Sequence, residues 1–167
     1  MNRILFLGFF LFLLGCEPDD ICSQSIQTTP RLVIEFFNIE NLLDSKTVPG
    51  LFAVGLDVDG NEIPIYGETV SSREKIKLPL DGNQNTTEFL LYKNYNIVDG
   101  DIEGEPSHII INYSTQYEYV SRACGYKNVY TIQGFDIQDD ADNWMILFVV
   151  QSNEVNNENT THIEIFH

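Results

Sequence analysis

Apolar residues recur at every second position through most of the chain after residue 30. In residues 31–37, RLVIEFF, this places Leu32, Ile34 and Phe36 on one face. A repeat of two is the period of a β-strand with one buried face. The other runs with this pattern are LFAVGLDV (51–58), EKIKLPL (74–80), TEFLLYK (87–93), SHIIINY (107–113), YEYVSRA (117–123), NVYTIQG (128–134), NWMILFVV (143–150) and HIEIFH (162–167).

Turn sequences separate these runs. Asp59-Gly60, Asp81-Gly82 and Asp99-Gly100 are steps typical of tight β-hairpins. The pattern predicts a single all-β domain over residues 23–167, an antiparallel β-sandwich of the Ig-like or a related Greek-key type. A small closed β-barrel is the alternative. The predicted faces in two of the runs are Phe52, Val54, Leu56 and Val58 in residues 51–58, and Ile76, Leu78 and Leu80 in residues 74–80.

Residues 1–15 have the pattern of an export signal. Arg3 precedes an apolar run, Ile4 to Leu14, that is shorter than the ~20 residues of a membrane-spanning helix. The run ends in Leu-Leu-Gly-Cys16, which resembles the bacterial lipobox. That resemblance implies a diacylglyceryl group on the Cys16 thiol and cleavage just before Cys16. Residues 16–22 would then be a lipidated N-terminus with an acidic tether.

The lipid anchor sets the expected location. We predict an outer-membrane lipoprotein of the cell envelope, attached to the membrane through its N-terminal lipid. The acids Glu17, Asp19 and Asp20 resemble the surface-export signals of Bacteroidetes lipoproteins, whose commonest form has Lys or Gln-Ala before the acids. Surface-exposed and periplasm-facing placements therefore both stay open, with a slight preference for the surface.

The cysteines divide into one anchor and one pair. Lipidation of Cys16 leaves Cys22 and Cys124, an even number in an oxidising compartment, which predicts a disulfide between them. Two free, buried thiols are the alternative. A redox-active pair is less favoured because the chain has no Cys-x-x-Cys sequence.

The charge of the chain excludes one class of partner. Its 25 acidic and 9 basic residues give a net charge of −16. A surface with this charge repels the phosphate backbone of nucleic acids. We therefore expect no nucleic-acid partner.

Two acidic loops are the candidates for a cation site. Residues 99–105, DGDIEGE, and 136–142 supply carboxylates that could bind calcium, and Asp99, Asp101, Asp139 and Asp140 are the candidate ligands. The first loop is not an EF-hand, because its twelfth position is Ile110 rather than Glu. Solvated turns are the simpler interpretation of both loops.

The chain offers little for catalysis. His162 and Glu164 share a face of the last predicted strand and could bind a metal or move a proton, but neither Gly-x-Ser-x-Gly nor HExxH occurs. We therefore predict no enzymatic activity and no cofactor. The expected function is binding or scaffolding of an envelope protein or a glycan. The alternative is a calcium- or metal-binding protein, or a metal-dependent hydrolase, that uses the acidic loops 99–105 and 136–142.

Several segments together resemble an uncharacterised family of Bacteroidetes lipoproteins, DUF6452. They are CEPDDIC (16–22), TPRLVIEFFN (29–38), YVSRACGYK (119–127), DNW (142–144) and HIEIF (162–166). The resemblance implies an envelope lipoprotein with no assigned activity and no catalytic residues to transfer.

Overall fold

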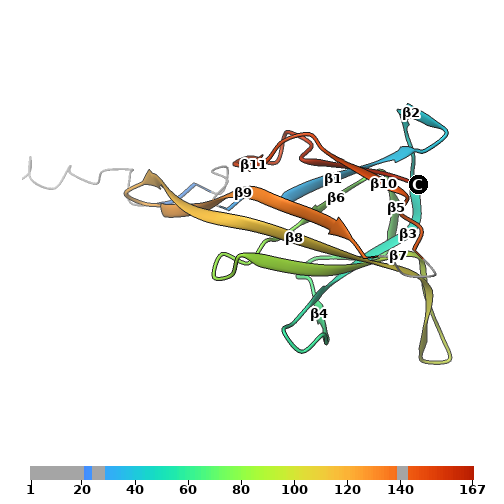
Figure 1. The fold of residues 1–167 in the computed structure, drawn as a ribbon. Coiled ribbons are helices and arrows are strands. Elements are labelled where there is room, and N and C mark those ends of the chain that lie inside the picture. Colours follow the sequence, from blue (N-terminus) through green and yellow to red (C-terminus); the bar gives the residue numbers. More distant parts are fainter. Residues whose placement is uncertain (1–20, 24–28, 139–142) are drawn as a thin grey trace, which may run out of the picture.

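The computed structural model describes residues 21–23, 29–138 and 143–167 of the chain. The predicted signal, Cys16 and the acids of the tether lie outside the described residues. Within the described residues the regular elements are β-strands, arranged in two sheets (Figure 1). This part of the chain contains no helix long and apolar enough to cross a membrane.

The smaller sheet is built around the first strand. Its order is β10–β12–β1–β2, and β6 pairs with the same edge of β1 as β2 does, further toward the start of the strand. The strands are β1 (Leu32–Asn38), β2 (Asn41–Ser45), β6 (Lys75–Leu78), β10 (Leu147–Val150) and β12 (Ile163–Phe166). β1 and β12 run parallel, whereas the other pairs in this sheet are antiparallel.

The larger sheet is dominated by three long strands. Its order is β11–β9–β8–β7–β3–β4, with β5 also paired with β3. The strands are β3 (Val48–Leu56), β4 (Glu62–Pro64), β5 (Ser71–Arg73), β7 (Thr86–Val98), β8 (Asp101–Ser121), β9 (Gly125–Ile137) and β11 (Glu154–Val155). The first half of β8 pairs with β7 and the second half with β9, so two hairpins project in opposite directions along β8.

The predicted β-sandwich is confirmed. The two sheets share one core, which takes side chains from both, and their strand orders do not close on themselves. The alternative of a closed barrel is therefore wrong. The parallel pair β1–β12 departs from a purely antiparallel arrangement. The two strands lie far apart in the sequence and are not joined by a hairpin.

Most of the predicted faces are confirmed by burial. Leu32, Ile34 and Phe36 are fully buried, as are Ile76 and Leu78. Trp144 is also buried in this core, where its ring packs against that of Phe36 and its Nε1 donates a hydrogen bond to the carbonyl oxygen of Leu91 over 3.1 Å. A buried indole N–H with a partner is the arrangement expected of a core tryptophan.

The prediction for β3 needs a correction. Its core-facing residues are Leu51 and Ala53, both fully buried, whereas Val58 lies beyond the strand and is 87% exposed. Phe52 lies on the outer face, where its ring centroid is 4.4 Å from that of Tyr95. Because both faces of β3 carry apolar residues, alternation alone could not tell which one joins the core.

Candidate functional site

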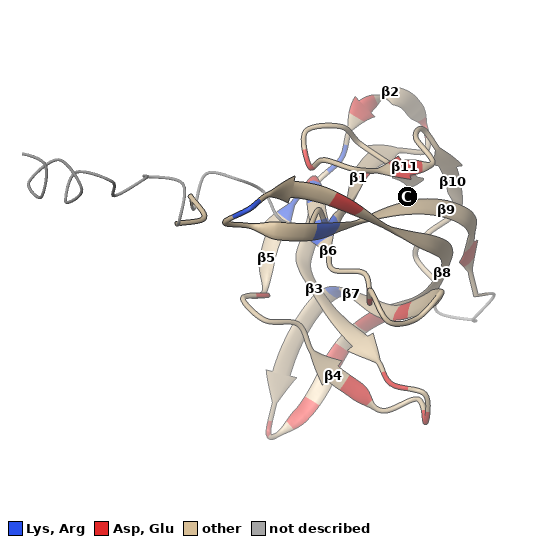
Figure 2. Ribbon diagram, turned by 90° about the vertical axis from the view of Figure 1, so that its left-hand side faces the viewer, with Lys and Arg blue, Asp and Glu red and all other residues tan. Residues whose placement is uncertain are grey.

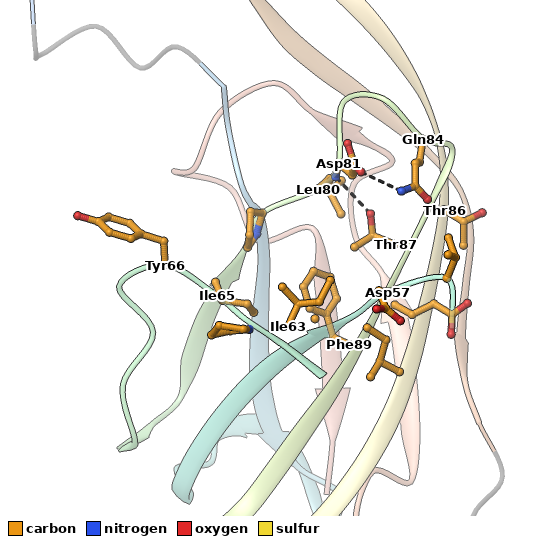
Figure 3. Close-up of a pocket in the computed structure, with 16 residues that line it drawn as sticks. Asp57, Ile63, Ile65, Tyr66, Leu80, Asp81, Gln84, Thr86, Thr87 and Phe89 are labelled. Atoms are coloured by element: carbon orange, nitrogen blue, oxygen red, sulfur yellow. Dashed lines mark hydrogen bonds between the residues drawn. The ribbon is translucent and has the colours of Figure 1, made fainter. Parts of the chain in front are cut away.

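A groove of about 560 Å³ lies where the β3–β4 hairpin approaches the turn between β6 and β7 (Figure 3). Its lining includes the end of β3, residues 63–66, residues 79–81 and the start of β7. The end of β3 and the start of β7 are neighbours in the larger sheet, where Gly55 pairs with Phe89 and Leu56 with Glu88. The groove thus takes its lining from β3, β4, β7 and the turn that follows β6, and its shape depends on the two turns.

The first turn is held by Asp57. Its Oδ1 accepts hydrogen bonds from the backbone N–H groups of Asp59 and Asn61 over 2.9 and 2.8 Å, and Gly60 takes the positive φ of 80° that the tight turn requires. Hydrogen bonds from the side chain and backbone of Asn61 lower the pKa of Asp57 below its ordinary value. Asp57 is therefore a fixed anion at the rim of the groove.

The second turn is held from inside the core. Tyr113 of β8 donates a hydrogen bond from its OH to the carbonyl oxygen of Asp81 over 2.8 Å, and Tyr130 of β9 donates one to Leu80 over 3.1 Å. Burial raises the pKa of both tyrosines, so they stay protonated donors. The carboxylate of Asp81 accepts hydrogen bonds from the backbone of Asn83 and the side chain of Gln84.

The lining of the groove is apolar and its rim is acidic. Leu56, Ile63 and Leu80 are among the apolar residues that line it, and Asp57 and Asp81 lie at its edge (Figure 3). Tyr66 also lines the groove, although its side chain is fully exposed and points outward. This combination suits a ligand that has both apolar groups and a positive charge.

The acidic loops do not converge in the described residues. Asp99 and Asp101 lie at the turn between β7 and β8, whereas Asp136 of the second loop pairs with Ile110 on β8. Ile110 is nine positions from Asp101, about 30 Å of extended strand. Asp139 and Asp140 lie outside the described residues. Where the structure describes the chain, no group of three or more His, Cys, Asp or Glu side chains is placed to hold a metal ion.

His162 is a buried part of the small sheet. Its Nδ1 accepts a hydrogen bond from the backbone N–H of Val33 over 2.9 Å, which joins the segment entering β12 to β1. Burial lowers the pKa of His162, so the neutral ring is favoured. Its neighbour in the proposed pair, Glu164, instead accepts a hydrogen bond from Gln151 over 2.8 Å.

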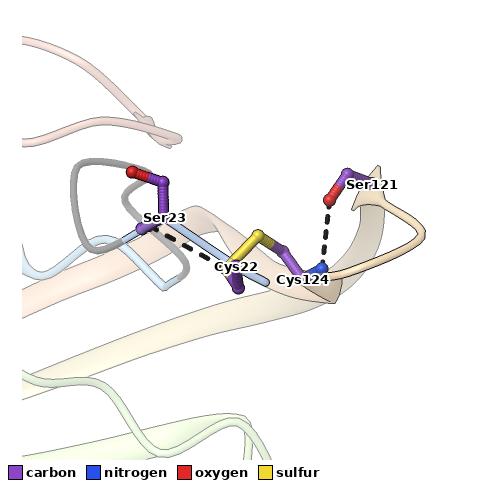
Figure 4. Close-up of a disulfide and its surroundings, with 4 residues drawn as sticks. All are labelled: Cys22, Ser23, Ser121 and Cys124. Carbon is purple, nitrogen blue, oxygen red and sulfur yellow. Dashed lines mark hydrogen bonds between the residues drawn. A yellow bond between two sulfur atoms is a disulfide. The ribbon is translucent and has the colours of Figure 1, made fainter. Parts of the chain in front are cut away.

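Cys22 and Cys124 form a disulfide, with their Cα atoms 4.8 Å apart (Figure 4). This is the pairing that the cysteine count predicts. Cys124 lies in the turn between β8 and β9, where its backbone N–H donates a hydrogen bond to Ser121 Oγ over 3.0 Å. The bridge therefore fixes the N-terminal segment to the tip of the β8–β9 hairpin.

Sequence reasoning missed two surface features. One is the groove, because residues 63–66 show no periodic pattern that would draw attention to them. The other is a set of exposed tyrosines on the β8–β9 hairpin, Tyr117, Tyr119 and Tyr126. The run YEYVSRA signals a strand with aromatic residues on one face, but the run alone does not reveal that the opposite sheet ends before it.

The comparisons with known proteins give a family without an assigned role. Residues 51–167 match the model of DUF6452, which is described as a family of unknown function. No curated protein and no solved structure matches the chain.

Proposed function

The chain belongs to the family of unknown function DUF6452, and from its own surface we propose that it is a non-enzymatic binding module. Its ligand is a segment of an envelope protein that carries apolar side chains and a lysine or arginine. The segment lies in the groove between the β3–β4 hairpin and the turn after β6.

The observation that carries this proposal is the pairing of an apolar lining with an acidic rim. Apolar side chains of a partner would be removed from water against Leu56, Ile63 and Leu80. A cation beside Asp57 and Asp81 would meet two fixed carboxylates, which favours a basic segment over an acidic one. The partner and the rim are thus complementary in charge.

A protein segment fits this groove better than a glycan does. Sugar rings commonly stack on exposed, flat aromatic side chains. The one phenylalanine of the lining, Phe89, is only 1% exposed, so its ring is not available for stacking. Tyr66 is exposed but points away from the groove (Figure 3).

The proposal includes a membrane anchor at Cys16. The order of Arg3, the apolar run, Gly15 and Cys16 supports lipidation. An acyl anchor would hold the module at the outer membrane and raise its effective concentration beside other envelope proteins. A surface-exposed protein is slightly favoured by the acids that follow Cys16.

Site-specific photo-crosslinking in cells tests the binding role. A photoreactive phenylalanine at position 58, where Val58 lines the groove and is exposed, should crosslink to a partner segment that contains apolar residues and a lysine or arginine. The same residue at position 97, on the distant β7–β8 hairpin, is the matched control. Ile63→Arg should abolish the crosslink by placing a bulky cation in the groove, and Asp81→Asn should weaken it. Equal crosslinking from positions 58 and 97, or a product that Ile63→Arg leaves unchanged, would refute the groove as the binding site.

The anchor is tested separately. Cys16→Ala should give a chain that is not acylated and that leaves the membrane fraction after a carbonate wash. A variant that still sediments with membranes would show that the lipobox interpretation is wrong. Protease treatment of intact cells then distinguishes surface exposure, in which the domain is digested, from a periplasmic location.

A further inference from the structure

We infer that the tip of the β8–β9 hairpin lies on the phospholipid surface, with Tyr117, Tyr119 and Tyr126 in the headgroup layer. This inference rests on the lipid anchor proposed above. It adds to that anchor a second contact with the membrane and a fixed orientation of the domain.

The tyrosines extend the core-facing side of the larger sheet. On β8 the alternate residues Ile109, Ile111 and Tyr113 are fully buried, and Tyr117 and Tyr119 continue the same alternation. They are nevertheless 72% and 58% exposed. Figure 1 shows the hairpin projecting beyond β1 and β6 of the smaller sheet. A face built with the alternation of a core strand is therefore left open to solvent.

The two strands of the hairpin contribute to one aromatic surface. Tyr119 pairs directly with Tyr126 across the hairpin, so both side chains stand on the same face. Their ring centroids are 5.4 Å apart in an edge-to-face arrangement, and Tyr126 is 67% exposed. Tyrosine has an apolar ring and a polar hydroxyl, which is why it is enriched at the boundary between lipid and water.

The length of the tether places this surface near the lipid. Cys22 is six positions after Cys16, and a chain segment of that length reaches at most ~22 Å. Cys22 is in turn bonded to Cys124 at the hairpin tip. The 21 residues of β8 extend for about 70 Å. Of the two ends of β8, the end that carries the tyrosines is thus the one held beside the anchored cysteine.

The charges near the tip do not oppose this contact. Residues 117–127 contain two basic residues, Arg122 and Lys127, and a single acid, Glu118. This segment therefore has a net charge of +1, although the net charge of the chain is −16. Lys127 and Glu118 form an ion pair over 3.4 Å. In Figure 2 basic segments lie near this tip, whereas acidic segments lie on the β3–β4 and β7–β8 hairpins, which extend in a different direction. Ile21, next to the disulfide, adds an exposed apolar side chain at the same end.

The contact is expected to depend on the tyrosines rather than on charge. The net charge near the tip is small, and the tether itself carries three acids. The surface that the tyrosines contact is therefore the headgroup layer of a zwitterionic phospholipid bilayer. Anionic lipid is not required for the contact.

Fluorescence quenching by brominated lipid tests the inference on the acylated chain. Tyr119→Trp is reconstituted into phosphatidylcholine vesicles with and without brominated acyl chains, and Ile97→Trp on the distal hairpin is the matched control. The emission of the wild-type chain, from Trp144, is subtracted from both. Brominated vesicles should cause a several-fold larger loss of emission for tryptophan at position 119 than for tryptophan at position 97.

The outcomes separate this inference from the anchor. A chain that mass spectrometry shows to be acylated and that floats with vesicles, yet loses no emission at position 119, would overturn the inference alone. A chain without acyl groups on Cys16 would overturn both proposals. Quenching that appears only when phosphatidylglycerol is added would show an electrostatic contact and would overturn a tyrosine-driven one.

Discussion

Glu158 accepts two hydrogen bonds from the guanidinium of Arg31, one on each carboxylate oxygen, although 127 positions separate the two residues. The distances are 2.8 Å from Nε and 2.9 Å from Nη2. The backbone N–H of Arg31 also donates to Oε1 over 3.1 Å, and Lys77 Nζ donates to Oε2 over 2.9 Å. The loop between β11 and β12 is thereby tied to the residue that precedes β1 and to β6.

Glu158→Gln should lower the free energy of unfolding at neutral pH by about 1–2 kcal/mol. The amide cannot accept both guanidinium hydrogen bonds, and it leaves Arg31 and Lys77 without their shared anion. The loss stays modest because the Arg31 side chain is half exposed. Urea denaturation measures the change, with Glu40→Gln at an exposed position as the control. Equal midpoints for the two variants would contradict a stabilising role for Glu158.

The contribution of Glu158 should disappear in acid. The hydrogen bond from Arg31 lowers the pKa of Glu158 to about 2, from 4.5 in the unfolded chain. Because the folded-state pKa is the lower one, the stabilisation is complete above pH 4.5 and is lost as the pH falls toward about 2. The difference in stability between wild type and Glu158→Gln should therefore shrink over this interval in denaturant titrations. A constant difference would rule out the ionised carboxylate as its source.

His162 should make the domain less stable in mild acid. Burial lowers its folded-state pKa below the 6.5 of the unfolded chain. As the pH falls below 6.5, the unfolded chain binds a proton that the folded chain does not, so folding is disfavoured. In His162→Asn the amide oxygen can still accept the Val33 hydrogen bond but does not titrate. The variant should lose less stability than wild type between about pH 7.5 and pH 5.5. Some dependence should remain, because burial also lowers the pKa of His167.

Removal of the disulfide should destabilise the domain without affecting lipidation. Closing a loop of about 100 residues contributes up to ~4.7 kcal/mol by restricting the unfolded chain. We expect less, because Cys22 holds an exposed segment that can detach while both sheets stay folded. Cys124→Ser should lower the melting temperature, and Cys22→Ser combined with Cys124→Ser should give the same value. A single variant that is much less stable than the double one would point to harm from the free thiol rather than to loss of the bridge.

Ser107 connects β8 to the segment that carries Trp144. Its fully buried hydroxyl donates to Asn143 Oδ1 over 2.6 Å and accepts the backbone N–H of Trp144 over 3.1 Å. Ser107→Ala removes both bonds and leaves the Trp144 N–H without this acceptor, which should cost about 1–3 kcal/mol. Ser114→Ala, on the same strand but partly exposed, is the control. Thermal unfolding that is equal for the two variants would contradict this role of the hydroxyl.

Alternation gave reliable faces wherever one side of a strand is clearly polar. In residues 74–80 the lysines mark the outer side, and Ile76 and Leu78 are buried as predicted. In β3 both sides are apolar, so the outer cluster of Phe52 and Tyr95 was indistinguishable from core. The closing pair β1–β12 also lay beyond prediction, because strand partners distant in sequence leave no local signal.

The candidate site was less accessible to sequence reasoning than the fold. The groove is created by two turns that meet in space, and one of them is held by Tyr113 and Tyr130 from strands far along the chain. The cysteine pairing was predictable because the lipobox resemblance assigns Cys16 to lipidation and leaves two cysteines, which exported proteins usually pair. The exposure of the tyrosines could not be predicted, because the sequence does not show where the opposing sheet ends.

The parallel pairing of β1 with β12 imposes an order on folding. Ile34 aligns with Ile163, so the centre of the smaller sheet is completed only after a strand 129 positions further along the chain has been synthesised. The long hairpins of β7, β8 and β9 join neighbours in sequence and can form before residue 163 has been synthesised. The larger sheet can therefore form while part of its apolar face is still uncovered, and this face is fully covered only when β12 joins the smaller sheet. A chain shortened before residue 163 would keep its hairpins but lose β12, which covers part of the core. The exposed apolar side chains would make such a chain a substrate for chaperones and proteases.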